Sequence, residues 1–178
     1  SSMGSHVSVV PNHQLNRKTP LHTRANVAYF GTFGYELDLN KLSYEEISEV
    51  KQQIAFMKEY RELIQFGTFY RLKSPFEGNE TAWMTVSEDK KTALVFWYRE
   101  RNVVNADFTR VRLQGLDPDL IYRNEYNGTE NYGDELMNLG LLTTDCTAGE
   151  PTSEDAPCTD YESRIYVLTT VARIPSPL

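Results

Sequence analysis

The hydrophobic periodicity of the chain changes at Gly67, and this change divides the sequence into two unlike parts. Before Gly67, apolar residues such as Val50 and Met57 recur at the three- and four-residue spacing of an amphipathic helix. After Gly67, short runs rich in Val, Ile, Thr and aromatic residues are separated by turn sequences, which is typical of an antiparallel β-sandwich. We therefore predict a mixed fold, with helix and strand in residues 1–66 and an antiparallel β-sandwich in residues 67–178.

The first part contains one strong helix signal. Ser43 and Glu46 have the spacing of a capping box, in which each side chain accepts a hydrogen bond from the backbone N–H of the other residue. The helix is expected to end at Gly67, with glycine in the left-handed conformation that commonly follows a helix. A shorter helix opened by Thr19-Pro20 and a strand over residues 33–39 precede it. Two helices and one strand cannot close a sheet, so this part needs further chain to complete its core.

The second part is predicted to consist of short strands, with a solvated loop over residues 143–160. The predicted strands cover residues 69–72, 82–86, 93–99, 109–113, 121–126 and 165–171.

Composition excludes two classes of partner. The net charge of −7 argues against nucleic acid, because phosphate binding needs clustered Lys and Arg. No apolar run approaches the roughly 20 residues of a membrane helix, so no membrane partner is expected. The N-terminal residues lack the basic and apolar segments of a signal peptide. We therefore expect a cytoplasmic protein, with secretion left open.

The histidines and cysteines do not form a recognisable metal motif. The spacings of His6, His13 and His22 do not place two imidazoles on one helix face. Cys146 and Cys158 have no nearby histidine, so they fall short of a four-ligand zinc site. They are either free thiols or a disulfide, and the sequence does not decide between these. No metal and no cofactor are predicted.

A series of segments resembles one known enzyme family. They are Ser1-Ser-Met-Gly-Ser-His-Val-Ser8 with Val10-Pro-Asn-His-Gln14, Thr19-Pro20 with Thr23-Arg24, Phe33-Gly-Tyr-Glu-Leu-Asp-Leu39, Arg61-Glu-Leu-Ile-Gln-Phe-Gly67 with Phe69-Tyr-Arg-Leu72, and Gly133-Asp-Glu-Leu-Met-Asn-Leu-Gly140. Together they cover nearly the whole chain and resemble the C-terminal portion of the α-galactosidases, or melibiases, of glycoside hydrolase family 36. Residues 143–160 depart from the family pattern, since this segment is longer and more acidic than the region usually is.

The resemblance implies that residues 1–66 are the C-terminal end of a (β/α)₈ catalytic barrel and that residues 67–178 are a C-terminal β-sandwich domain. Enzymes of this family are retaining glycosidases that use two aspartates, with carboxyls about 5 Å apart. In the family pattern both aspartates precede the segment at Ser1, which implies that this chain holds no catalytic residue. The implied partners are the upstream barrel of the same polypeptide and, through the parent enzyme, α-galactosides such as melibiose or raffinose. A homotetramer is the implied assembly of the parent.

Two groups of polar residues in the first part are candidates for a site. Ser5 and His6 are the substrate-rim candidates, because they are expected near the carboxyl end of a barrel strand, where barrel enzymes place functional groups. Glu36 and Asp38 lie two residues apart on one predicted strand and would sit side by side, not across a substrate. We interpret Asp38 as part of the turn before the helix capped at Ser43.

The leading hypothesis is therefore a structural, catalytically inactive C-terminal part of an α-galactosidase. One alternative is a stand-alone carbohydrate-binding β-sandwich module, in which Trp83, Trp97 and Tyr98 would stack on sugar rings instead of packing in the core. A weaker alternative is an independent hydrolase that uses Glu36 and Asp38.

Overall fold

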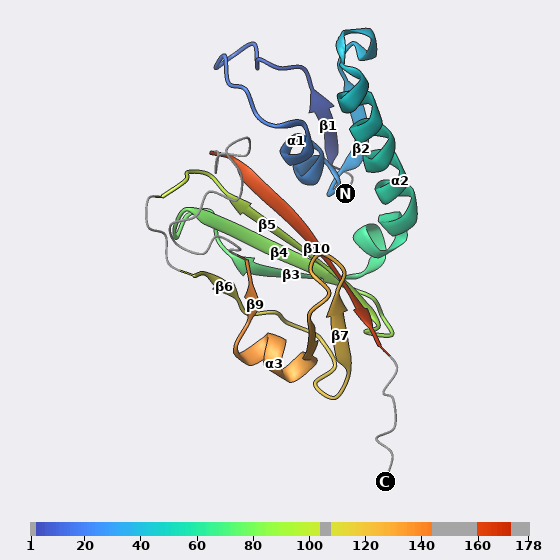
Figure 1. Ribbon diagram of the computed structural model, residues 1–178, viewed down its shortest axis with the longest axis vertical. Helices are drawn as coiled ribbons and strands as arrows, with labels where there is room; N and C mark the ends of the chain where they lie inside the picture. The colour runs from blue at the N-terminus through green and yellow to red at the C-terminus, as the bar shows by residue number, and fades with distance from the viewer. Residues whose placement is uncertain (1–2, 104–107, 144–159, 172–178) are drawn as a thin grey trace.

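Residues 3–103, 108–143 and 160–171 are described by the structure, a computed structural model of the 178-residue chain (Figure 1). Cys146 and Cys158 lie outside the described residues, as does nearly all of the predicted loop over residues 143–160.

The first part consists of two parallel strands with helices on one face (Figure 1). Strand β1 (Gly4–Ser8) leads through helix α1 (Leu21–Ala28) to strand β2 (Thr32–Glu36). A short 3₁₀ turn, η1 (Leu39–Lys41), connects β2 to helix α2 (Tyr44–Phe66). A strand, a crossover helix and a parallel strand form the unit from which (β/α)₈ barrels are built.

The strands of this part differ from the prediction in two respects. Strand β1 was not predicted, because its sequence Gly-Ser-His-Val-Ser contains a single strong β-former, Val7. The predicted strand over residues 33–39 is too long. Strand β2 ends at Glu36, because the side chain of Asp38 accepts a hydrogen bond from the backbone N–H of Asn40 at 3.0 Å and starts the 3₁₀ turn.

Helix α2 begins as predicted. Its capping box is complete: Ser43 N donates to Glu46 Oε2 at 2.8 Å, and Glu46 N donates to Ser43 Oγ at 3.2 Å. The buried face of α2 includes Val50, Met57 and Ile64, which belong to one apolar cluster with residues of β1 and α1 and of the sheet that follows.

Helix α2 ends at Gly67 as predicted, but the predicted left-handed conformation of this glycine is wrong. The residue has φ −65° and ψ 163°, which is extended backbone and not the left-handed conformation. Glycine is needed for a steric reason instead. A Cβ at this position would lie 2.5 Å from the carbonyl oxygen of Leu63 and 2.9 Å from that of Val86, and both atoms belong to the backbone. Gly67 thus forms a tight corner between α2 and the sheet that follows.

The second part is an antiparallel β-sandwich. Its larger sheet has six strands in the order β3-β4-β5-β10-β7-β8, and its smaller sheet pairs β6 with β9. The elements are β3 (Thr68–Lys73), β4 (Glu80–Val86), β5 (Thr92–Arg99), β6 (Arg110–Val111), β7 (Ile121–Asn124), β8 (Glu130–Tyr132), α3 (Gly133–Asn138), β9 (Leu141–Leu142) and β10 (Glu162–Thr170).

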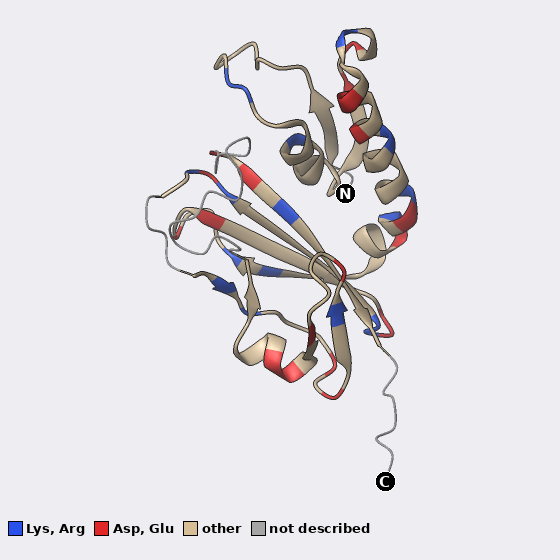
Figure 2. Ribbon diagram, in the orientation of Figure 1, with Lys and Arg blue, Asp and Glu red and all other residues tan. Residues whose placement is uncertain are grey.

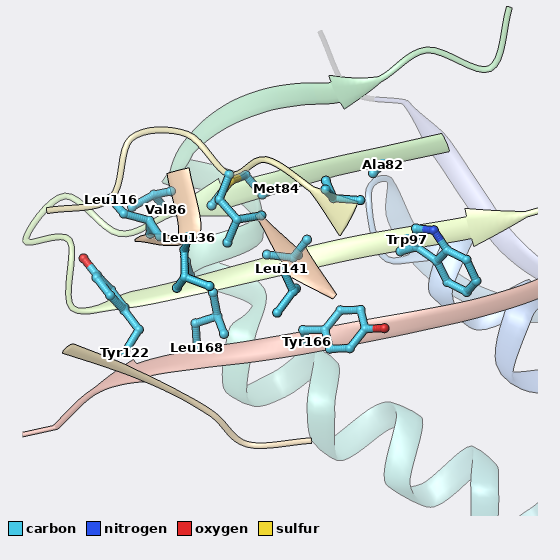
Figure 3. Packing of buried hydrophobic residues seen from close by; sticks show 14 residues of the cluster. Ala82, Met84, Val86, Trp97, Leu116, Tyr122, Leu136, Leu141, Tyr166 and Leu168 are labelled. Atoms are coloured by element: carbon cyan, nitrogen blue, oxygen red, sulfur yellow. The ribbon is translucent and has the colours of Figure 1, made fainter. Parts of the chain in front are cut away.

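The six-stranded sheet is covered on both faces, which explains the unbroken apolar run of β5. Alternate residues such as Val95 and Trp97 enter the sandwich core, where Figure 3 shows Trp97 with Tyr166 and other core residues. The residues between them, such as Phe96, pack against the first part. Trp97 has 1% of its surface exposed, so the prediction that it belongs to the core is confirmed.

Helix α1 joins the two parts through a chain of hydrogen bonds to the large sheet. Tyr98 donates its hydroxyl hydrogen to the carbonyl oxygen of Asn26 at 2.6 Å, and Asn26 Nδ2 donates to Ser163 Oγ at 2.9 Å. Ser163 Oγ lies 2.8 Å from Thr23 Oγ1, which donates to the carbonyl oxygen of Tyr161 at 2.8 Å. Across the described ranges, no helix is sufficiently long and apolar to span a membrane.

Candidate functional site

Strands β1 and β2 have one face that packs against helices and one bare face. Val7 of β1 is fully buried and belongs to the cluster that contains the apolar residues of α1. Tyr35 lies opposite Val7 and donates its hydroxyl hydrogen to Gln53 Oε1 of α2 at 2.8 Å. Successive side chains of a strand point to opposite faces, so the alternate residues form the bare face. These residues are Gly4, His6, Ser8, Thr32, Gly34 and Glu36.

The side chains of His6 and Glu36 are in hydrogen-bond contact on the bare face. His6 Nε2 of β1 lies 2.6 Å from Glu36 Oε2 of β2, near the carboxyl ends of both strands. The two side chains are 51% and 74% exposed in this chain. Ser8 stands directly opposite Glu36 in the register, so an imidazole, a carboxylate and a hydroxyl group belong to one small polar patch.

Ser5 lies on the other face of β1, away from this patch. It is opposite Phe33, whose ring stacks on Tyr29 with ring centroids 4.8 Å apart, on the side of the helices. A Cβ built on Gly31 would lie 2.4 Å from Ser5 Cβ, so Ser5 packs closely against the chain that leaves α1. The structure therefore separates the two candidates, with His6 on the bare face and Ser5 on the helix face.

Glu36 and Asp38 have different partners and do not act as a pair. Glu36 is bound to His6, whereas Asp38 Oδ1 accepts hydrogen bonds from the backbone N–H and the side-chain amide of Asn40, both at 3.0 Å. The interpretation of Asp38 as a turn residue is confirmed. The pairing of Glu36 with His6 was not predicted from the sequence.

Arg24 of α1 holds the end of β1 in place. Its guanidinium donates to the carbonyl oxygen of Ser8 through Nη1 and to that of Thr19 through Nε at 3.0 Å. Burial lowers the pKa of Arg24, and the carboxylates of Glu46 and Glu49 act in the opposite direction. The carboxyl end of β1, beside the His6–Glu36 pair, is thus fixed by a partly buried cation.

An ionic cluster lies at the end of the six-stranded sheet where β10 begins (Figure 2). Glu162 pairs with Arg99 and, at 2.7 Å, with Arg164 Nη2, and Glu80 pairs with Lys73. Both carboxylates are therefore already bound to cations. This cluster stabilises the end of the sandwich and offers no free acid or base.

One groove on the chain has aromatic walls. It has a volume of about 840 Å³ and lies beside the β3–β4 edge of the large sheet, near the N-terminal end of β1. Phe69 and Phe76 are exposed there, and Trp83 packs edge-on against Phe30 at a centroid distance of 5.2 Å. Within the described residues, no group of three or more His, Cys, Asp and Glu side chains could hold a metal ion.

Both parts of the chain match models of known protein families. Residues 1–67 match the family model "Melibiase", and residues 80–168 match the model "Glycosyl hydrolase family 36 C-terminal domain". The chain belongs to glycoside hydrolase family 36.

Individual relatives are similar over most of this family-36 chain. It is 54% identical over 141 residues to alpha-galactosidase AgaA of Geobacillus stearothermophilus, covering 79% of this chain and 19% of that protein. The crystal structure of the α-galactosidase from Lactobacillus brevis superimposes with a TM-score of 0.85 at 43% identity, over 96% of this chain and 23% of that one. The structure of an AgaA variant in complex with raffinose gives a TM-score of 0.84 at 47% identity, over 95% of this chain and 22% of that one. This chain therefore spans only about a fifth of the length of these relatives.

The predicted fold is confirmed: the chain forms the end of a (β/α)₈ barrel followed by an antiparallel β-sandwich. In such a barrel the helices cover the outside and the opposite face of each strand lines the interior. The bare face of β1 and β2 is consequently the interior face of the family-36 barrel. The His6–Glu36 pair lies on that face toward the carboxyl ends of the strands, the side on which barrel enzymes carry their active sites.

Proposed function

We propose that this chain is the C-terminal part of a retaining α-galactosidase that removes terminal α-linked galactose from oligosaccharides such as melibiose and raffinose. The observation that carries the proposal is the 54% identity to an α-galactosidase over most of the chain, from the barrel end into the sandwich. The raffinose complex of the AgaA variant, whose structure this chain resembles, supports the substrate class.

The chain itself has a structural role in this proposal and is inactive alone. A retaining glycosidase needs two carboxyl groups about 5 Å apart on opposite sides of the bond that is cleaved. Among the described residues of the bare face, Glu36 is the single carboxylate, and it is already bound to His6. Both catalytic aspartates therefore belong to the upstream barrel, and the reaction needs no cofactor.

We further propose a division at Gly67, with residues 1–66 as the barrel end and residues 67–178 as the sandwich domain. The upstream barrel is the principal partner. In the described part of the chain β1 and β2 pair only with each other, so each leaves one edge for a neighbouring barrel strand. His6, on the interior face, is the rim residue we favour, whereas Ser5 would act from the helix face. A tetrameric parent in the cytoplasm remains a prediction.

The test compares the full-length polypeptide that carries this chain with residues 1–178 alone. We expect the full-length protein to hydrolyse p-nitrophenyl α-galactoside and raffinose and to release galactose as the α-anomer, as followed by NMR. We expect no turnover by the chain alone. An inactive full-length protein, or release of the β-anomer, would contradict the proposal. Turnover by the chain alone that Asp38→Ala abolishes would favour the independent hydrolase.

The aromatic groove beside β3 keeps a carbohydrate-binding function open as a second candidate. Exposed Phe69 and Phe76 with the edge of Trp83 offer apolar surface of the kind that stacks on sugar rings. Isothermal titration of the chain with melibiose distinguishes the two functions. Heat of binding that Phe69→Ala abolishes would support the binding module, and absence of heat at millimolar sugar would exclude it.

A further inference from the structure

We propose that Glu36 is a positioning residue that fixes the imidazole of His6, so that His6 Nδ1 accepts a hydrogen bond from a hydroxyl group of the bound sugar. This inference rests on the proposed function and adds to it the roles of two residues that supply no catalytic carboxyl. It follows from the geometry of the pair and from its place on the interior face, toward the carboxyl ends of β1 and β2.

The parallel register of β1 and β2 brings the two residues together. His6 stands opposite Gly34, and Glu36 stands two residues farther along the same face of β2. Gly34 carries no side chain beside the imidazole, and a Cβ built there would meet no atom of the described residues within 4 Å.

The contact with Glu36 determines which nitrogen of His6 remains available. An ionised carboxylate can only accept, so His6 Nε2 must donate its hydrogen to Glu36 Oε2 across the 2.6 Å contact. In a neutral imidazole with the hydrogen on Nε2, Nδ1 is an acceptor. Nδ1 has no hydrogen-bond partner in the described part of the chain. It is thus suited to accept an O–H hydrogen from a sugar, while Glu36 prevents the ring from rotating.

The pair is not needed to hold β1 and β2 together. The backbone hydrogen bonds hold β1 to β2 whatever the two side chains are. Arg24 already fixes the end of β1 through the carbonyl oxygen of Ser8. What the pair adds is a defined orientation of a hydrogen-bonding group, which is what a sugar-binding surface requires.

The test is a double-mutant cycle in the full-length enzyme. We expect His6→Ala to lower kcat/KM for p-nitrophenyl α-galactoside by about tenfold, the effect of one hydrogen bond in a binding site. Glu36→Ala should lower it about three- to fivefold, because the imidazole loses its orientation. In the double variant the loss should equal that of His6→Ala alone, since Glu36 acts through His6. Glu36→Gln, whose amide oxygen can still accept from Nε2, should recover activity to within about twofold of the unchanged enzyme.

Two control variants match these changes at exposed positions outside the proposed site. His22→Ala on α1 and Glu130→Ala on β8 should leave kcat/KM unchanged. Binding of galactose, measured by calorimetry, gives a second readout that needs no turnover. The variants should weaken galactose binding in the same order in which they lower kcat/KM. The positioning role would be overturned if Glu36→Ala lowered kcat/KM by the same factor in the His6→Ala variant as in the unchanged enzyme. Unchanged activity of His6→Ala in an active enzyme would also overturn it. A full-length protein that hydrolyses other glycosides but neither cleaves α-galactosides nor binds galactose would instead overturn both the proposed function and this inference.

Discussion

Replacing Thr23 with valine should loosen the attachment of the barrel end to the sandwich. Valine has nearly the shape of threonine, so the change leaves no cavity and removes only the hydroxyl. Thr23 is 6% exposed, and its hydroxyl donates to the carbonyl oxygen of Tyr161 and accepts from Ser163 Oγ, both at 2.8 Å. Each such bond contributes about 1 kcal/mol net, and of the two partners left behind Ser163 is buried and Tyr161 is half-buried. We therefore expect the free energy of unfolding to fall by about 2 kcal/mol.

Urea unfolding of the 178-residue chain, followed by circular dichroism, measures this change. A loss of about 2 kcal/mol corresponds to a decrease in Tm of roughly 4–8 °C for a chain of this size. Ser163→Ala interrupts the same chain of hydrogen bonds, so the double variant should lose about 1 kcal/mol less than the sum of the single variants. Thr32→Val, at an exposed position of β2, is the matched control and should change stability by less than about 0.5 kcal/mol. A loss for Thr23→Val no larger than that of the control, or strictly additive effects with Ser163→Ala, would refute the reasoning.

Three further predictions concern separate parts of the fold. Gly67→Ala should destabilise the chain by about 1–3 kcal/mol in urea unfolding, because the new Cβ would lie 2.5 Å from the carbonyl oxygen of Leu63, and an unchanged midpoint would contradict the steric explanation. Ser43→Ala should cost about 1 kcal/mol in the same assay by removing the cap of α2. Ser48→Ala, at an exposed position within the same helix, is the control and should change stability by less than about 0.5 kcal/mol. Burial raises the pKa of Tyr35 to about 12, above the value of about 10 in the unfolded chain. The contribution of Tyr35 to the free energy of unfolding is therefore complete below pH ~10 and is lost as the pH rises toward ~12. In the Tyr35→Phe variant, the urea midpoint should decrease less steeply over this pH range. An equally steep decrease in the variant would exclude ionisation of Tyr35 as its cause.

Local signals in the sequence were sufficient for the elements that depend on neighbouring residues. The start of α2 was predicted to the residue because Ser43 and Glu46 satisfy each other's backbone within one turn. Strand β5 was predicted because an apolar run between turn sequences indicates burial on both faces. The family was recognisable from the ordered motifs and is confirmed by the family models.

Features that depend on distant parts of the chain were missed. Strand β1 becomes a strand through parallel pairing with β2, about 28 residues away, and its own sequence has little β-propensity. The conformation of Gly67 is determined partly by Val86, which belongs to a different strand. At the candidate site, His6 was favoured for its place near a strand end, but its contact with Glu36 was not predicted. The available signal was the strand–helix–strand spacing, which places the carboxyl ends of both strands side by side.

The tight corner at Gly67 has a practical consequence for recombining domains among family-36 enzymes. A crossover between α2 and β3 would take Leu63 from one parent and Val86 from the other, although the carbonyl oxygens of both lie less than 3 Å from the position of a Cβ on Gly67. A crossover earlier in α2, before Leu63, would transfer the corner, its two flanking carbonyl groups and the sandwich as one inherited block. Hybrids built in this way should express as soluble protein more often than hybrids joined at the apparent domain boundary.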